Sequence, residues 1–341
     1  IPIFDAGLSL ITQTSLFCKR IFRVNVYLPV AHVSVNLLWM LFFGFIVGGM
    51  AGFFGVGGGF LITPMLNAIF GVPYPVAVAS SLSLLVGITV ASTIRHSKYG
   101  NIDYKLGLVM VIGTSIGVDA GAKLLSLIKS LQNLLPGIGG HHIDVLELIL
   151  SLSYIVMLSL IGLSIFRESL KTIKMTKSTA SGEGISGEPE ASKSVKRIRA
   201  LKIKPIIRFP ASGITGISIW VIMGIAFVVG MMSGFMGIGG GFILMPALIY
   251  IIGCPTVVAV GTSLFGILFT AGYGAFTYAL EGEVDLVLVV SLLISSSIGS
   301  VIGASFTRKA GGPNVRMLFS LIAFVAVIIV AIKLGVTLFH R

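Results

Sequence analysis

The chain has 341 residues, of which 55% are hydrophobic and only 11% are charged. A soluble domain carries about 25% charged residues, so this composition, with a mean hydropathy of +1.05, excludes a soluble protein and predicts that lipid surrounds most of the chain. The net charge of +12 would suggest nucleic acid as a partner of a soluble protein, but Lys and Arg cluster here between apolar stretches, as in cytoplasmic loops of membrane proteins. We therefore expect the lipid bilayer, and no nucleic acid, as a partner.

Residues 1–36 precede the first long apolar helix and carry Lys19, Arg20 and Arg23. We expect this N-terminal segment to form an amphipathic surface helix or an additional membrane crossing.

The first membrane unit is predicted at residues 37–166. Glycine recurs at every fourth position of its first apolar helix, a spacing that lets helices approach closely in lipid. The next helix, predicted at residues 60–70, would be roughly 17 Å long, which is short for a hydrocarbon core of about 30 Å, so we predict a half-helix. Three further apolar stretches complete the unit.

Residues 167–208 are hydrophilic and rich in Lys and Arg, and we predict a flexible cytoplasmic linker there. The second membrane unit, residues 209–341, repeats the order of the first. The string GFFGVGGGF at Gly52–Phe60 returns 182 residues later as GFMGIGGGF at Gly234–Phe242.

The sequence thus predicts an all-α polytopic membrane protein with two repeats of about five apolar elements each, whose helices are interrupted at the glycine strings. Because five is odd, the second repeat should be inverted relative to the first. The loop at residues 95–105 is basic and its repeat mate at residues 281–285 is acidic, as expected for loops on opposite sides of a membrane. The three basic residues of the N-terminal segment do not follow this rule.

The triple glycines are the predicted substrate-binding groups. Where a helix begins within a membrane, its first N–H groups lack partners and carry partial positive charge, so they can bind an anion without a buried Lys or Arg. Glycine allows close approach to these amides and tolerates positive φ. The alternative is that the glycines only permit close packing. The six candidates are Gly57, Gly58, Gly59, Gly239, Gly240 and Gly241.

The two glycine strings, each followed by a proline at the same distance (Pro64 and Pro246), resemble the paired signatures of the TauE/SafE family of permeases for sulfite and sulfonates. The resemblance covers residue 37 to the C-terminus. It implies transport of sulfite, sulfonates or related organosulfur anions across the cytoplasmic membrane by a multi-pass protein.

Four hydroxyl residues match the polar patch that follows each signature in that family: Ser80, Ser81, Thr262 and Ser263. We expect them to lie near the glycines, where their hydroxyls could donate to an oxyanion. Alternatively, they bond to backbone carbonyls of their own helices.

Asp119 is an acid within an apolar span, and Lys123 lies on the same helical face four residues later. Asp119 is a candidate for proton coupling; the alternative is an ion pair in which the Lys side chain extends outward. We expect no cofactor and no metal site, because His141 and His142 lack convergent ligands.

Three functions remain open from the sequence. The first is a secondary transporter of organosulfur anions that works by alternating access, and the second is a carrier of another small anion such as a carboxylate. The third is a membrane enzyme or signalling protein with the linker as a docking segment, for which only Asp119 and Lys123 offer chemistry. The direction of transport and the oligomeric state cannot be predicted from the sequence.

Overall fold

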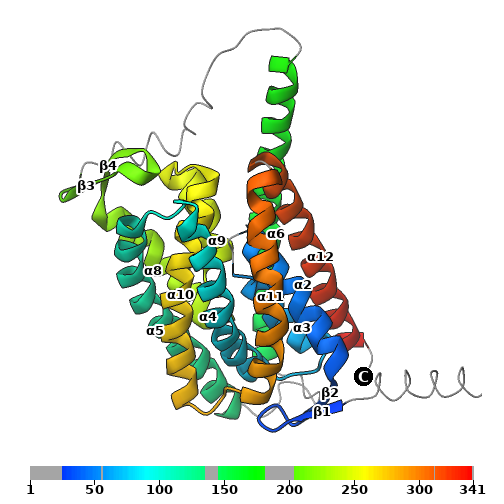
Figure 1. The fold of residues 1–341 in the computed structure, drawn as a ribbon. Coiled ribbons are helices and arrows are strands. Elements are labelled where there is room, and N and C mark those ends of the chain that lie inside the picture. The colour runs from blue at the N-terminus through cyan, green and yellow to red at the C-terminus, as the bar shows by residue number, and fades with distance from the viewer. Residues whose placement is uncertain (1–24, 55–56, 135–144, 181–202, 311, 340–341) are drawn as a thin grey trace, which may run out of the picture.

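The computed structural model describes residues 25–54, 57–134, 145–180, 203–310 and 312–339, and most of these residues are helical (Figure 1). Within this described part, eight helices are long and apolar enough to cross a membrane. They are α2 (Leu37–Phe54), α4 (Tyr74–Lys98), α5 (Tyr104–Leu134), α6 (Val145–Ala180), α8 (Ile219–Met236), α10 (Thr256–Leu280), α11 (Leu286–Ala310) and α12 (Gly312–Phe339). The prediction of an all-α polytopic membrane protein is confirmed.

Each glycine string is followed by a short helix. Helix α3 (Gly59–Ala68) has 10 residues, and α9 (Gly241–Pro246) continues into the π-helical segment η2 (Ala247–Ile252). Pro246 has no N–H to donate, and the hydrogen-bond ladder continues beyond it in the wider π form. Both helices are too short to cross the bilayer, as predicted for half-helices.

A β-hairpin precedes the first helix of each repeat. Strands β1 (Asn25–Leu28) and β2 (Val33–Asn36) pair antiparallel, as do β3 (Ile206–Phe209) and β4 (Ile214–Ser218). Residues 25–36 therefore form a hairpin, where we expected an amphipathic helix or a crossing. The rest of that N-terminal segment, with its three basic residues, lies outside the described residues.

Helix α6 extends beyond its apolar span, Leu146–Arg167, and protrudes from the bundle as far as Ala180 (Figure 1). The first part of the predicted linker is thus helical. It contains neither Gly nor Pro, so nothing in its sequence interrupts the helix that enters it. Most of the remaining linker lies outside the described residues.

The elements recur at the sequence offset of the glycine strings. Helices α8 and α10 begin and end 182 residues after α2 and α4, and α9 and α11 begin 182 residues after α3 and α5. The hairpins recur at nearly the same distance.

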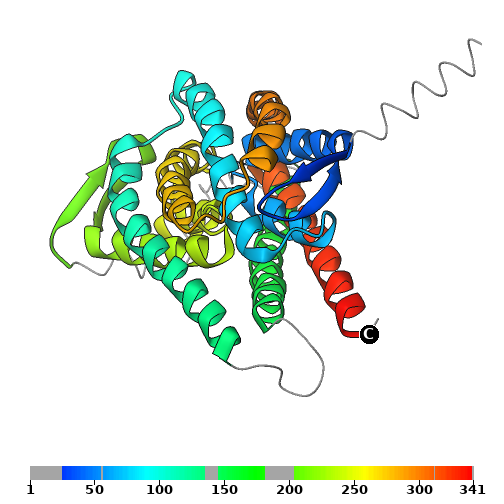
Figure 2. The ribbon, with the colours of Figure 1, turned by 90° about the horizontal axis from the view of Figure 1, so that it is seen from below.

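Packing runs mainly between the repeats. Helix α2 lies against α11, α8 against α5, α4 against α10 and α6 against α12, and Figures 1 and 2 show α11 beside α2 from two directions. At two of these contacts, glycines bring helix backbones together. A Cβ atom added to Gly48 would lie 2.0 Å from the carbonyl oxygen of Ser296, and one added to Gly117 would lie 2.2 Å from that of Phe227. No side chain fits at either position.

Two buried aspartates join the repeats reciprocally. Asp103 precedes α5, and its amide donates to Thr262 Oγ1 of α10 at 2.9 Å. Asp285 precedes α11, and its amide donates to Ser80 Oγ of α4 at 3.0 Å. Asp103 follows the end of α4 and bonds near the start of α10, and Asp285 follows the end of α10 and bonds near the start of α4. The two helices therefore run antiparallel.

The carboxylates of these aspartates bind the hairpin of the other repeat. Asp103 accepts a hydrogen bond from Ser212 Oγ at 2.6 Å, and Asp285 accepts one from the amide of Val30 at 2.9 Å. Each carboxylate also caps its own helix, by accepting the amide three residues later. Both ends of the α4–α10 pair are therefore fixed by equivalent contacts.

We predict opposite effects of two Gly→Ala substitutions. Gly48→Ala should lower the free energy of unfolding by about 1–3 kcal/mol, because the added methyl group collides with the backbone of α11. Gly224→Ala on α8, where nothing lies within 4 Å, should raise stability by up to about 1 kcal/mol through helix propensity. Thermal unfolding of both variants in detergent tests this; equal stability of the two would contradict the close contact.

Candidate functional site

The two glycine strings meet inside the bundle. A Cβ atom added to Gly59 would lie 2.3 Å from the carbonyl oxygen of Ile238, so the backbones of the two strings are in contact. The rings of Phe60 and Phe242, one residue into each short helix, lie 4.7 Å apart between centroids, and Phe319 of α12 packs against both. The short helices α3 and α9 therefore begin at the same place.

The glycine conformations at the two helix starts are equivalent. Gly58 and Gly240 occupy the N-cap positions with φ of 80° and 79°, and Gly57 and Gly239 also have positive φ. The carbonyl of Gly58 accepts the amides of the residues three and four positions later, as does that of Gly240. The amides of the two residues directly after each cap have no acceptor within their helix. All six glycines are buried.

Hydroxyl groups from three other helices bind carbonyls of the second glycine string. Tyr278 of α10 donates to the Gly234 carbonyl at 2.6 Å, and Tyr154 of α6 donates to that of Met236. Ser81 of α4 donates to the Gly237 carbonyl at 2.8 Å. These bonds hold the string by its carbonyl oxygens. Its Gly237 amide donates to the Ser233 carbonyl at 2.8 Å, so the amides that lack an acceptor within their helix are those at the start of α9.

The four hydroxyl residues singled out from the sequence take different places. Ser81 lies at the second glycine string, where it also bonds Thr63 at 2.8 Å. Ser80 and Thr262 accept the amides of the two buried aspartates, and Ser263 donates to a carbonyl of its own helix at 2.9 Å. Among these contacts, only that of Ser81 is with the glycine string. A role of the four in binding substrate stays a prediction.

Ser233 of α8 is a candidate that sequence reasoning missed. Its side chain is fully buried, and its hydroxyl has no hydrogen-bond partner among the described residues. A Cβ atom added to Gly240 would lie 3.7 Å from the Ser233 Cβ, so this hydroxyl lies beside the second helix start. The sequence held a signal, because the equivalent position of the first repeat is Ala51.

Asp119 and Lys123 form the ion pair that their spacing allows, with Nζ and Oδ2 2.7 Å apart. The Asp119 side chain is 39% exposed and that of Lys123 is 76% exposed, so the pair lies on the outer face of α5. This geometry suits the structural alternative, in which Lys123 extends outward. Proton coupling by Asp119 stays a prediction.

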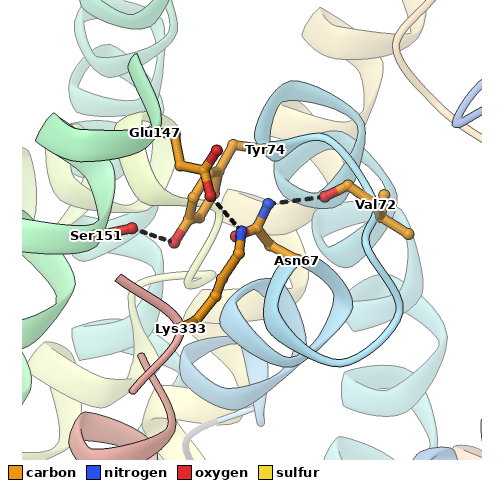
Figure 3. Close-up of polar contacts among 6 residues, drawn as sticks. All are labelled: Asn67, Val72, Tyr74, Glu147, Ser151 and Lys333. Carbon is orange, nitrogen blue, oxygen red and sulfur yellow. Dashed lines mark hydrogen bonds and ion pairs between the residues drawn. The ribbon is translucent and has the colours of Figure 1, made fainter. Parts of the chain in front are cut away.

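A second ion pair, between Lys333 of α12 and Glu147 of α6, lies within the apolar spans and was missed by sequence reasoning (Figure 3). Lys333 also donates to Asn67 near the end of α3. Tyr74 lies beside this pair and bonds Ser151 at 3.0 Å. The network therefore ties the far end of the first half-helix to α6 and α12. A lone acid and a lone base in two apolar stretches were the available signal.

Other reactive groups do not form a site within the described part of the chain. Burial raises the pKa of the Cys254 thiol to about 12, so the thiol stays protonated at neutral pH and is a poor nucleophile. In the same residues, no group of three or more His, Cys, Asp or Glu is arranged to hold a metal ion. His141 and His142 lie outside the described residues.

A helical bundle that spans the membrane and contains two broken helices meeting at their starts is the architecture of membrane transport proteins. The sequence profile described as "Sulfite exporter TauE/SafE" matches residues 40–332, and the chain therefore belongs to this family.

Named relatives agree with that class. The chain is 26% identical to the "Probable membrane transporter protein YunE" of Bacillus subtilis, over 84% of this chain and 94% of the relative. It is 29% identical to the "Probable membrane transporter protein YdhB" of the same organism, over 77% of this chain and 87% of the relative. An archaeal relative, the "Probable membrane transporter protein MJ0441" of Methanocaldococcus jannaschii, is 24% identical over 82% of this chain and 90% of the relative. No solved structure matches the chain significantly.

Substitution of Ser233 distinguishes a role in binding the anion from a role in stability. Ser233→Ala removes a buried hydroxyl that has no partner in the described part of the chain, so stability should stay equal or rise. If the hydroxyl binds the transported anion, the KM for that anion should rise by about tenfold, which corresponds to about 1.4 kcal/mol. Transport kinetics in liposomes and thermal unfolding in detergent measure the two effects. An unchanged KM would remove Ser233 from the site.

For the Lys333–Glu147 pair we predict that Lys333→Met and Glu147→Gln each lower the free energy of unfolding by about 1–3 kcal/mol, because each leaves a half-buried charge without its partner. The double variant should recover part of the loss, since it removes both charges. Unfolding of all four proteins in detergent gives the coupling energy, and strictly additive losses would contradict the interaction.

Proposed function

We propose that this protein is a secondary transporter that carries sulfite, sulfonates or related organosulfur anions across the cytoplasmic membrane. The observation that carries the proposal is the meeting of the two glycine strings, which brings two helix starts together in buried, apolar surroundings. Two sets of helix-terminal amides directed at one place form a site for an anion. The family description, which names sulfite, supports the sulfur anions as substrates.

The hydrogen bonds of the second string support an anion as the ligand. A carbonyl oxygen repels an anion, whereas an amide N–H attracts it. The carbonyls of Gly234 and Gly237 are engaged by hydroxyls from other helices, so their negative ends are partly neutralised. The Ser233 hydroxyl, which lies beside Gly240, could donate a further hydrogen bond to an oxyanion.

Transport requires the bundle to open, because the glycines are buried in this conformation. We propose that the two repeats lie inverted in the membrane and exchange access to the glycine strings between its two sides. The antiparallel course of α4 and α10, which occupy equivalent places in the two repeats, supports the inversion. Coupling to protons through Asp119 is a further proposal.

The transport assay described below also tests two other functions. A carrier of carboxylates would use the same amides, and a docking protein would need the linker and no substrate at all. An enzyme is the least supported, because its nucleophile, acid and base would have to converge within the bundle.

The test is binding and uptake of sulfite, thiosulfate, methanesulfonate and acetate by the purified protein, in detergent and in liposomes, at two pH values. We expect saturable uptake of a sulfur anion and weaker uptake of acetate. Preference for acetate would move the substrate class to carboxylates, and uptake of none would contradict the proposal.

We predict that Gly58→Ala abolishes uptake, since the added methyl group would lie 3.0–3.2 Å from atoms of Val47 and Ala51 of α2 and would displace the start of α3, which Gly58 caps. Gly71→Ala is the matched control: Gly71 has a similar φ of 69°, so the backbone strain is comparable, but nothing lies within 4 Å of its Cβ position. Uptake by the control should stay near that of the wild type. If Gly58→Ala is correctly folded and transports normally, the glycine strings are not the site.

A further inference from the structure

A cavity of about 320 Å³ lies where α5 and α10 approach the loop that leads into α11. Its walls include Ser126 and Lys129 of α5, Tyr278 of α10, and Glu281 and Glu283 of the loop. This volume accommodates a small sulfonate or sulfite with several water molecules, each of which occupies about 30 Å³ in the liquid. The cavity contains charged groups of both signs, unlike the apolar interior around the glycines.

Among the described residues that line this cavity, Lys129 is the one cation, and a carboxylate binds it. Lys129 Nζ donates to Glu283 Oε1; the Lys129 side chain is half exposed, whereas that of Glu283 is only 18% exposed. Burial and the neighbouring charge of Glu283 raise the pKa of Glu281, an effect that Lys129 opposes. In the part of the lining that the structure describes, Tyr278 is the remaining titratable group, and a phenol stays neutral in the physiological range.

The inner wall of the cavity connects it to the glycine strings. Tyr278 is 1% exposed, and its hydroxyl donates to the carbonyl of Gly234, the first residue of the second string. A displacement of this one side chain would therefore act on the string directly. The cavity thus extends from the exposed Lys129 at its mouth to a group that holds the candidate binding site.

We propose that this cavity is the vestibule through which the anionic substrate reaches the glycine strings, that Lys129 attracts the anion, and that the Glu283 carboxylate occupies Lys129 until the anion displaces it. The inference rests on the proposed function and names the access route to the same site. Glu283 then acts as an internal competitor of the substrate, and removal of its charge favours binding.

The Glu281 carboxylate determines how the affinity for the anion depends on pH. Protonation of Glu281 removes a negative charge from the vestibule, so a lower pH increases the affinity for the anion. Because its pKa is raised, Glu281 takes up its proton at a higher pH than an ordinary glutamate does. As the pH rises and Glu281 ionises, the affinity falls.

The first experiment measures sulfite uptake into liposomes by the full chain and three variants at several pH values. Lys129→Met should raise KM by about tenfold with kcat little changed, whereas Glu283→Gln should lower KM. Lys98→Met, at the C-terminal end of α4, removes one exposed positive charge that does not line the cavity and should behave as the wild type. An unchanged KM in both vestibule variants would overturn the proposal while leaving transport intact.

The second experiment tests the vestibule without relying on transport. Ser126→Cys, in a chain with Cys18→Ser and Cys254→Ser, is labelled with membrane-impermeant anionic and cationic methanethiosulfonate reagents. The anionic reagent should react faster when Glu283→Gln is added and slower when Lys129→Met is added, and the cationic reagent should show the reverse. Equal rates in all backgrounds would overturn the vestibule, even if sulfite proves not to be a substrate.

Discussion

Backbone contact between helices of different repeats is the constraint on which the rest of the bundle depends. Lipid is as apolar as a leucine side chain, so helices associate in it through close packing, and glycine provides the closest approach. Gly48 against α11 and Gly117 against α8 leave no space for a side chain. Each repeat therefore completes the helix pairs of the other. The two glycine strings meet because this exchange brings α3 and α9 to the same place.

In our proposal, backbone amides bind the anion where the two glycine strings meet, and side chains hold that backbone in place. Tyrosine and serine hydroxyls bind carbonyls of the second string, and the N-cap glycines have a conformation that side chains rarely allow. The far end of α3 is held separately by Lys333 and Glu147. A site built in this way needs no buried cation, which is costly to place within a bilayer.

The sequence predicted where the helices begin and end better than it predicted which helices pack together. The repeat offset and the apolar stretches determine where helices begin and end, because those boundaries depend on local composition. Which helices pair depends on tertiary packing, so the sequence did not predict that Ser80 and Thr262 accept the amides of the aspartates of the other repeat. The Glu147–Lys333 pair escaped notice for the same reason, since its members are far apart in the chain.

The central claim is that an anion binds between the two helix starts, and a structure with bound bromoethanesulfonate tests it most directly. The bromine atom identifies the ligand by anomalous scattering. Our account predicts the sulfonate within hydrogen-bond distance of the amides that follow Gly58 and Gly240, about 2.7–3.2 Å from nitrogen to oxygen. A sulfonate bound at saturation only elsewhere, with the glycine strings still in mutual contact, would contradict it.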